Sequence, residues 1–187
     1  MHGVVSLLDD EHYALVEDIW DELSRTFGVS GVYVTPFPHF SYEVAEGYDV
    51  KTAENFLQEL AARTRPFRIR TVGLGIFTLS APVLYMPLVR SPALSALHRE
   101  IWDGITPTEP GAVTQYYEPE RWVPHLTLAH RDIDRDKLAE IVRYLSGKNL
   151  HWEMTVNNLS VIYDTGTEQG LLCRFNFTGE HEEDDNC

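Results

Sequence analysis

The chain has little positive charge. Its 187 residues include 15 lysines and arginines against 29 aspartates and glutamates, and the formal net charge is −14. The run Glu180–Asp185 supplies five of the carboxylates, so the rest of the chain is acidic too. Proteins that bind long nucleic acids usually present a basic face, because phosphate contacts supply much of the affinity. We therefore expect no long duplex nucleic acid as a partner, but a small nucleotide or an RNA end held in a local pocket.

Cysteine is also scarce, with only Cys173 and Cys187. Cys173 lies in an apolar run and Cys187 ends the acidic tail, so we expect a buried thiol and a terminal one rather than a disulfide or a metal site. No apolar run approaches the ~18–20 residues that a membrane span needs. The first residues show no basic stretch followed by an apolar one. We therefore expect no signal peptide, no membrane contact and a cytoplasmic location.

The residues that are present predict four helices and a series of strands. Hydrophobic residues make up 43% of the chain, which is enough for a core. Apolar periodicity and capping residues predict helices at Asp10–Phe27, Thr52–Arg65, Pro92–Ile105 and Arg135–Leu145. Extended runs are predicted at Gly3–Leu8, Val32–Val34, His39–Val44, Phe67–Thr78, Val83–Val89, Val123–His130, Trp152–Tyr163 and Leu171–Phe177.

The order strand, helix, strand, helix and two strands occurs twice in this pattern. Glu17–Asp21 also resembles Arg99–Asp103, which supports a duplication. Few, long helices between strands favour antiparallel sheets. We predict an α+β fold with one bilobal domain over residues 1–179. Its two pseudo-symmetric halves would form two mostly antiparallel sheets with flanking helices around a central groove. Residues 180–187 are predicted to be an acidic, disordered tail.

Two segments share the form Pro-His-apolar-hydroxyl, one containing His39 and Ser41 and the other His125 and Thr127. Side chains alternate between the faces of a strand, so each histidine shares a face with its hydroxyl. One copy alone is more often a structural strand histidine. A matched pair, one in each half, favours a catalytic pair, because pseudo-twofold symmetry would bring the two faces together in a groove.

Two imidazoles and two hydroxyls in one groove suit phosphodiester cleavage without a metal. In-line displacement at phosphorus needs a base on the attacking side and an acid on the leaving side. Histidine serves in either role near neutral pH. Hydroxyl groups can donate hydrogen bonds to the non-bridging oxygens as their charge grows. The motif pair therefore predicts an acid/base phosphodiesterase with no cofactor and no metal.

These motifs resemble the two His-x-Ser/Thr signatures of the two-histidine (2H) phosphoesterase superfamily, with Arg121–Leu128 similar to its second motif and Ser41 in place of the commoner threonine. The resemblance implies a bilobal fold and metal-independent hydrolysis of 2′,3′-cyclic phosphates or 2′–5′ linkages. It also implies that one histidine activates water while the other protonates the departing ribose oxygen, with Ser41 and Thr127 holding the phosphate. We assign His125 as the base and His39 as the acid, although the direction of the reaction could exchange these roles.

Tyr116, Tyr117 and Trp122 precede the second motif, where aromatic rings could stack on a base. We expect simple packing for at least two of the three and take Tyr117 and Trp122 as substrate-binding candidates. Glu43 shares the face of His39, so it either orients a histidine or reaches solvent. His130 lies five positions after His125, on the opposite face of a regular strand. It is therefore expected at the surface and not in a metal site with His125, unless a twist or bulge turns it towards the substrate.

Two other functions fit the same sequence. A noncatalytic nucleotide- or RNA-end-binding protein could use the same groove, although it would not need two opposed acid/base groups. An interaction domain could instead use its acidic tail to bind a basic partner. We take the phosphodiesterase as the leading hypothesis and expect the protein to be a monomer.

Overall fold

The computed structural model describes residues 1–46, 48–78, 80–105, 113 and 115–179, so the acidic tail and Cys187 lie outside the described residues. The helices are α1 (Asp10–Phe27), α2 (Val50–Arg63), α3 (Pro92–Ile105) and α4 (Arg135–Leu145). The strands are β1 (His2–Leu7), β2 (His39–Ala45), β3 (Phe67–Arg70), β4 (Gly75–Phe77), β5 (Val83–Pro87), β6 (His125–Ala129), β7 (Glu153–Val156), β8 (Asn158–Asp164) and β9 (Gln169–Asn176).

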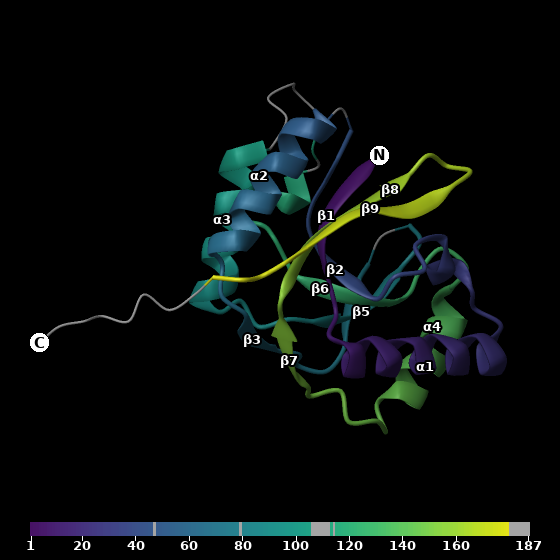
Figure 1. Cartoon of the computed structure of the whole chain (residues 1–187). Helices are drawn as coiled ribbons and strands as arrows, with labels where there is room; N and C mark the ends of the chain where they lie inside the picture. The colour runs from purple at the N-terminus through teal and green to yellow at the C-terminus, as the bar shows by residue number, and fades with distance from the viewer. Residues whose placement is uncertain (47, 79, 106–112, 114, 180–187) are drawn as a thin grey trace, which may run out of the picture.

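Every strand pairing in the described chain is antiparallel, which confirms the predicted α+β class (Figure 1). One sheet has the order β2-β1-β8-β9, and another has the order β4-β5-β6. The β3–β7 pair joins the second sheet just beyond β3, where an isolated bridge links Thr71 to Leu88. Two strand layers result, and each contains one of the two histidine motifs.

The layers do not correspond to consecutive halves of the chain. The first sheet combines β1 and β2 with β8 and β9 from the far end of the sequence. The single run predicted at Trp152–Tyr163 divides between the layers, because β7 pairs with β3 whereas β8 pairs with β1. Asn158 fixes the division: its buried amide donates to the Leu7 carbonyl at 2.8 Å and accepts from the Leu7 amide at 3.1 Å. The terminal strands therefore close the first layer.

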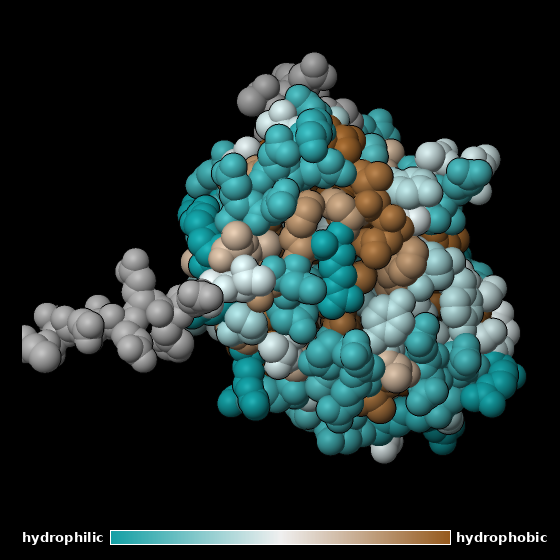
Figure 2. Space-filling model, viewed as in Figure 1, coloured by the Kyte–Doolittle hydropathy of each residue, from teal (hydrophilic) through white to brown (hydrophobic). Residues whose placement is uncertain are grey.

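Helices pack on both layers around the main hydrophobic core, and a smaller buried cluster of Val5, Leu7 and Ile162 is separate from it. α2 contacts β8 and β9, α3 contacts β2, and α1 contacts β6 and α4. Figure 2 shows a largely hydrophilic surface with one apolar area over β8 and β9, where Leu171 and Leu172 are exposed. Cys173 on β9 is half-buried rather than fully buried. No helix of the described residues has both the length and the apolar character that a membrane crossing requires.

Capping residues set the helix boundaries. The Asp9 carboxylate accepts a hydrogen bond from the His12 amide before α1, and Gly28 ends that helix in the left-handed region at φ 66°. The predicted bounds of α1, α3 and α4 are confirmed. α2 starts two residues earlier than predicted, because the Asp49 carboxylate caps it by accepting from the Thr52 amide.

Two of the predicted extended runs are wrong in part. Val32–Val34 belongs to a 3-10 helix, Gly31–Val34, and is not extended. The Asp132 carboxylate explains the difference, since it accepts from the Ser30 amide at 2.6 Å and from the Gly31 amide at 3.0 Å. The run predicted at Phe67–Thr78 is split into β3 and β4, with Gly73 between them in the left-handed region at φ 76°.

Candidate active site

Both histidines of the paired motif stand at the first position of a strand, His39 on β2 and His125 on β6. The two strands contact each other between the layers. The preceding prolines fit these strand starts because proline has no amide hydrogen. The carbonyl of each proline still pairs with a neighbouring segment: Pro38 accepts from the Leu8 amide at 3.2 Å, and Pro124 accepts from the Leu88 amide at 2.9 Å.

Each imidazole is fixed by the carbonyl two residues before it. Nδ1 of His125 lies 2.7 Å from the Val123 carbonyl oxygen, and Nδ1 of His39 is hydrogen-bonded to the Phe37 carbonyl. A carbonyl oxygen can only accept, so Nδ1 must carry the hydrogen in both rings. This arrangement leaves Nε2 of each ring for proton transfer with a substrate.

The two rings influence each other electrostatically. Burial lowers the pKa of His39, and the nearby His125 lowers it further, against the opposing effect of the Phe37 carbonyl. Burial also lowers the pKa of His125, while the Val123 carbonyl raises it. The two rings therefore lie close enough to disfavour a doubly protonated pair, although His39 and Ser41 are not among the residues that line the pocket beside His125.

The hydroxyl residues are anchored through their backbones by two tryptophans. The Trp122 indole donates to the Ser41 carbonyl at 2.9 Å, and the Trp20 indole donates to the Thr127 carbonyl at 3.0 Å. Thr127 lines the same pocket as His125. The Ser41 hydroxyl is hydrogen-bonded to Tyr117. Each motif is therefore held by an indole from outside its own strand.

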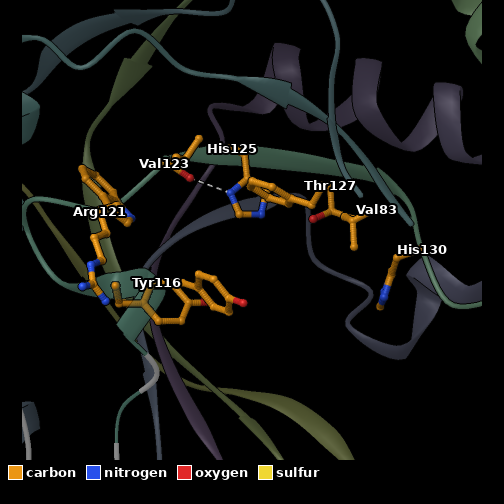
Figure 3. A pocket seen from close by; sticks show the side chains of 10 residues that line it. Val83, Tyr116, Arg121, Val123, His125, Thr127 and His130 are labelled. Carbon is orange, nitrogen blue, oxygen red and sulfur yellow. Dashed lines mark hydrogen bonds between the residues drawn. The ribbon is translucent and has the colours of Figure 1, made fainter. Parts of the chain in front are cut away.

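A pocket of about 410 Å³ opens beside the second motif (Figure 3). Its lining residues are Phe77, Val83, Tyr116, Tyr117, Arg121, Trp122, Val123, His125, Thr127 and His130. The ring of His125 lies against two aromatic rings, with centroid distances of 5.0 Å to both Phe77 and Tyr85. In Figure 3, Tyr116 and Arg121 lie across the pocket from His125 and Thr127. The cavity offers an imidazole, a hydroxyl and aromatic walls to one ligand.

His130 lines this pocket, so the expectation of a surface position on the opposite face is wrong. The β5–β6 register shifts between Leu84 and Tyr85, so Leu128 is an extra residue in β6. Leu128 and Ala129 are both buried, and this bulge returns His130 to the side of His125 and Thr127. The chain then turns at Arg131, whose φ is 71°, and the Asp132 amide donates to the His130 carbonyl at 3.0 Å. In the described part of the chain, no cluster of three or more acidic, histidine or cysteine side chains could hold a metal ion.

The two aromatic candidates differ in how much surface they offer. Trp122 is 2% exposed, and its ring stacks on that of His98 with a centroid distance of 3.9 Å. It therefore has little free surface on which a nucleotide base could stack. Tyr117 is half-buried. Burial and the Glu43 carboxylate raise its pKa to about 12, and the hydrogen bond with Ser41 opposes this effect. Tyr116 is 70% exposed and is the better placed ring for stacking.

Glu43 is buried rather than solvent-exposed, and it accepts a hydrogen bond from the Tyr48 hydroxyl at 2.6 Å. Sequence patterns also offered no reason to select Arg121 and Phe77, which line the pocket. Arg121 stood inside the second motif without an assigned role. Phe77 lies 48 residues before His125, and only the pairing of β4, β5 and β6 brings it to the site.

We expect Trp122→Phe to destabilise the protein by about 1–3 kcal/mol, because it leaves the buried Ser41 carbonyl without its indole donor. A fall in kcat should accompany this loss if the indole sets the position of the first motif. Urea denaturation and steady-state kinetics measure the two effects. Trp152→Phe is the matched control, since its indole donates to the exposed Asn149 carbonyl at 3.0 Å. Equal stability of the two variants would contradict the prediction.

Known proteins share this sequence pattern and this fold. The sequence model of the 2′-5′ RNA ligase superfamily matches residues 8–168. A protein of Geobacillus kaustophilus named "Putative phosphoesterase" is 24% identical over 67% of this chain and 69% of its own length. A protein of Bacillus cereus with the same name is 25% identical over 67% of this chain and 70% of its own.

The fold itself has a solved counterpart. The crystal structure of TT0787 of Thermus thermophilus superimposes with a TM-score of 0.67 at 18% identity, covering 96% of this chain and 99% of that one. The residues that the family model matches include both histidine motifs and the pocket-lining residues from Phe77 to His130. The chain belongs to the 2′-5′ RNA ligase superfamily, whose two-histidine phosphoesterases break or form phosphodiester bonds.

Proposed function

We propose that the protein is a metal-independent phosphodiesterase that hydrolyses 2′,3′-cyclic phosphates of nucleotides or RNA ends, or 2′–5′ linkages. One observation carries the proposal: His39 and His125 stand on contacting strands with Nδ1 fixed by a backbone carbonyl in each ring. This arrangement leaves two Nε2 atoms available for one acid/base reaction. Thr127 in the pocket and Ser41 on β2 supply hydroxyl donors for the phosphate.

In this reaction one neutral imidazole removes a proton from water, and the water oxygen forms a new bond to phosphorus. The bond from phosphorus to a ribose oxygen breaks on the opposite side. The other imidazole, protonated at Nε2, gives its proton to that leaving oxygen. The pair therefore still holds one proton, now on the other ring, and exchange with solvent returns it to the starting ring; no electron transfer or further reactant is required.

The electrostatics favour His125 as the acid and His39 as the base, the reverse of the sequence-based assignment. Burial lowers both pKa values and the repulsion between the rings acts on both, but His39 is the more deeply buried ring, so its charged form is the less favourable of the two. The first proton therefore goes to His125, which enters the reaction as the donor. The roles exchange in the reverse reaction, as microscopic reversibility demands.

A noncatalytic nucleotide-binding protein is the second candidate. The Tyr116 ring and the apolar pocket wall favour it, because they suit ligand stacking without any reaction. It does not account for two imidazoles held in the same tautomer on facing strands. The two candidates differ in one result, which is turnover.

We expect hydrolysis of 2′,3′-cyclic nucleotides to continue unchanged in excess EDTA. The assay follows the phosphomonoester product by ³¹P NMR or chromatography, with cyclic nucleotides of all four bases and 2′–5′-linked dinucleotides as substrates. Turnover that stops with EDTA and returns with a divalent cation contradicts the metal-free mechanism. Tight binding with no turnover of any of these substrates favours the noncatalytic candidate.

A further inference from the structure

The face of the second layer that carries His125 continues beyond the pocket across further strands. Extending the β5–β6 register by two residues beyond the Pro87–His125 pair places Val89 opposite Val123, at the rim of the pocket. The Val89 amide donates to the Arg70 carbonyl at 2.8 Å, and Arg70 pairs with Glu153 between β3 and β7. Residues directly opposite one another share a face of the sheet. A continuous row therefore runs from the pocket to Glu153.

This face is open, whereas the opposite face is packed against the core. Val72, Val89 and Val123 are 49%, 45% and 42% exposed, but Ile69 and Met154 on the other side are each 2% exposed. Exposed β-branched side chains on a sheet normally pack against another element. Here they form an apolar surface that is continuous with the pocket wall at Val123.

Two arginines border the apolar surface. Arg68 and Arg70 lie two positions apart on β3, so they share a face, and they line a second hollow of about 260 Å³ together with Val89 and Glu153. Their side chains are 74% and 72% exposed. In a chain with a net charge of −14, this is a local concentration of positive charge beside the catalytic pocket.

Glu153 occupies both arginines in the free protein. Its carboxylate lies 3.1 Å from Nε of Arg70, and its other oxygen is paired with Nη1 of Arg68. Solvent-exposed ion pairs contribute little to stability, so a phosphate can replace the carboxylate at little cost. The arginine fork also matches phosphate geometry as well as it matches a carboxylate.

We propose that this open face binds the single-stranded nucleotides attached to the reacting phosphate, so that the protein prefers short RNA ends to isolated cyclic nucleotides. Sugars and bases would lie on Val72, Val89 and Val123, and a backbone phosphate would bind Arg68 and Arg70, two strands away from β6. Strands are about 4.8 Å apart, so this phosphate lies roughly 10 Å from the β6 strand. The inference rests on the proposed function only in assuming that the reacting phosphate binds in the pocket beside His125. Two features indicate single-stranded nucleotides as the ligand of this face: the positive charges of Arg68 and Arg70 complement a phosphate, and the apolar surface is continuous with the pocket.

The first test compares substrates of increasing length. We expect kcat/KM to rise about tenfold from a cyclic mononucleotide to an oligonucleotide of three or four residues with the same cyclic end. For Arg68→Ala/Arg70→Ala, we expect this preference to fall about five- to tenfold, through KM rather than kcat. Arg143→Ala, which removes an exposed arginine from α4, is the matched control. Equal kcat/KM for all lengths in the wild-type protein overturns the inference.

A binding measurement separates this inference from the proposed function. Fluorescence anisotropy with a 3′-phosphorylated single-stranded oligonucleotide needs no turnover. We expect the double arginine variant to bind more weakly and to lower the slope of log affinity against log salt by about 0.7, since the two arginines bind one phosphate and each phosphate contact on a single strand contributes about that amount. If the wild-type protein shows this arginine-dependent binding but no turnover, the proposed function is rejected and the inference stands. If the double variant binds the oligonucleotide as tightly as the wild-type protein, the inference that the open face binds nucleotides is rejected.

Glu153→Gln provides a test in the opposite direction. Removing the carboxylate frees both guanidinium groups while nearly preserving side-chain volume, so oligonucleotide affinity should rise about two- to fivefold. A structural disturbance of the β3–β7 pair would lower the affinity instead. An unchanged or lower oligonucleotide affinity in this variant, with an unchanged unfolding midpoint, contradicts the proposed exchange of carboxylate for phosphate.

Discussion

Replacing His125 or His39 with alanine should lower kcat for a 2′,3′-cyclic nucleotide by about 10²–10⁴-fold, with a much smaller change in KM. The reason is that each ring transfers a proton only in the transition state, a contribution typically of that size for general acid or base catalysis. The double variant should be little worse than either single variant, because two groups that act on one proton path are not additive. Stopped or continuous assays of phosphomonoester release measure all three variants.

The controls must separate chemistry from folding. Both rings are partly buried at strand starts, so an unfolding curve should accompany each variant. His39→Gln and His125→Gln keep a hydrogen-bond donor near the Phe37 and Val123 carbonyls but cannot act as acid or base at neutral pH. They should therefore be as inactive as the alanine variants. His151→Ala removes an exposed histidine outside the pocket and should turn over cyclic mononucleotides normally. A glutamine variant with more than a tenth of wild-type kcat would contradict the assigned chemistry.

The sequence could predict that each motif histidine shares a strand face with its hydroxyl residue, because that geometry is local. Strand alternation alone put each histidine beside its hydroxyl, and the repeat assigned the two motifs to different parts of the fold. The structure places Thr127 with His125 in the pocket and lets His39 and His125 interact. Apolar periodicity located the helices for the same reason, since capping residues and helix faces lie within a few positions of one another.

The errors arose where distant residues decide local conformation. His130 was assigned to the surface by regular alternation, but the shifted pairing of β5 with β6 leaves Leu128 as an extra residue and reverses the alternation after it. The short segment at Val32–Val34 has β-branched residues, yet Asp132, a hundred positions away, binds the amides of Ser30 and Gly31 and tightens it into a 3-10 helix. No pattern within these segments contains that information.

The same limit applies to the layers and to the open face. The run at Trp152–Tyr163 looks continuous, and only the contacts of Asn158 with Leu7 show that its two parts belong to different sheets. Arg68 and Arg70 are far from both motifs in the sequence. The antiparallel bridge between Thr71 and Leu88, just beyond the ends of β3 and β5, places them on the face that carries His125.

The pH dependence should show an optimum on the acidic side of neutrality. Activity requires one protonated and one neutral ring, and the pKa values of both His39 and His125 are lowered by burial from the usual value of about 6.5. At neutral pH and above, both rings are therefore mostly neutral and the acid is missing. Lowering the pH from about 8 to about 7 should raise kcat/KM nearly tenfold, because the singly protonated pair increases tenfold per unit on that limb. At still lower pH the second proton binds, the base is lost and activity falls again.

The two limbs belong to the pair, since each ring changes the proton affinity of the other. Moving the pKa of one ring should therefore shift both limbs. The Phe77→Leu substitution can do this without replacing either histidine. It removes the ring whose centroid lies 5.0 Å from that of His125, and it admits more water to the imidazole. Better solvation favours the charged form and raises the pKa of His125, so the alkaline limb should move to higher pH. Tyr144→Leu, which removes a partly exposed ring from α4 outside the pocket, should leave the profile in place. A profile of Phe77→Leu that coincides with wild type, or an optimum of the wild-type enzyme above about pH 8, would be incompatible with two buried imidazoles sharing one proton.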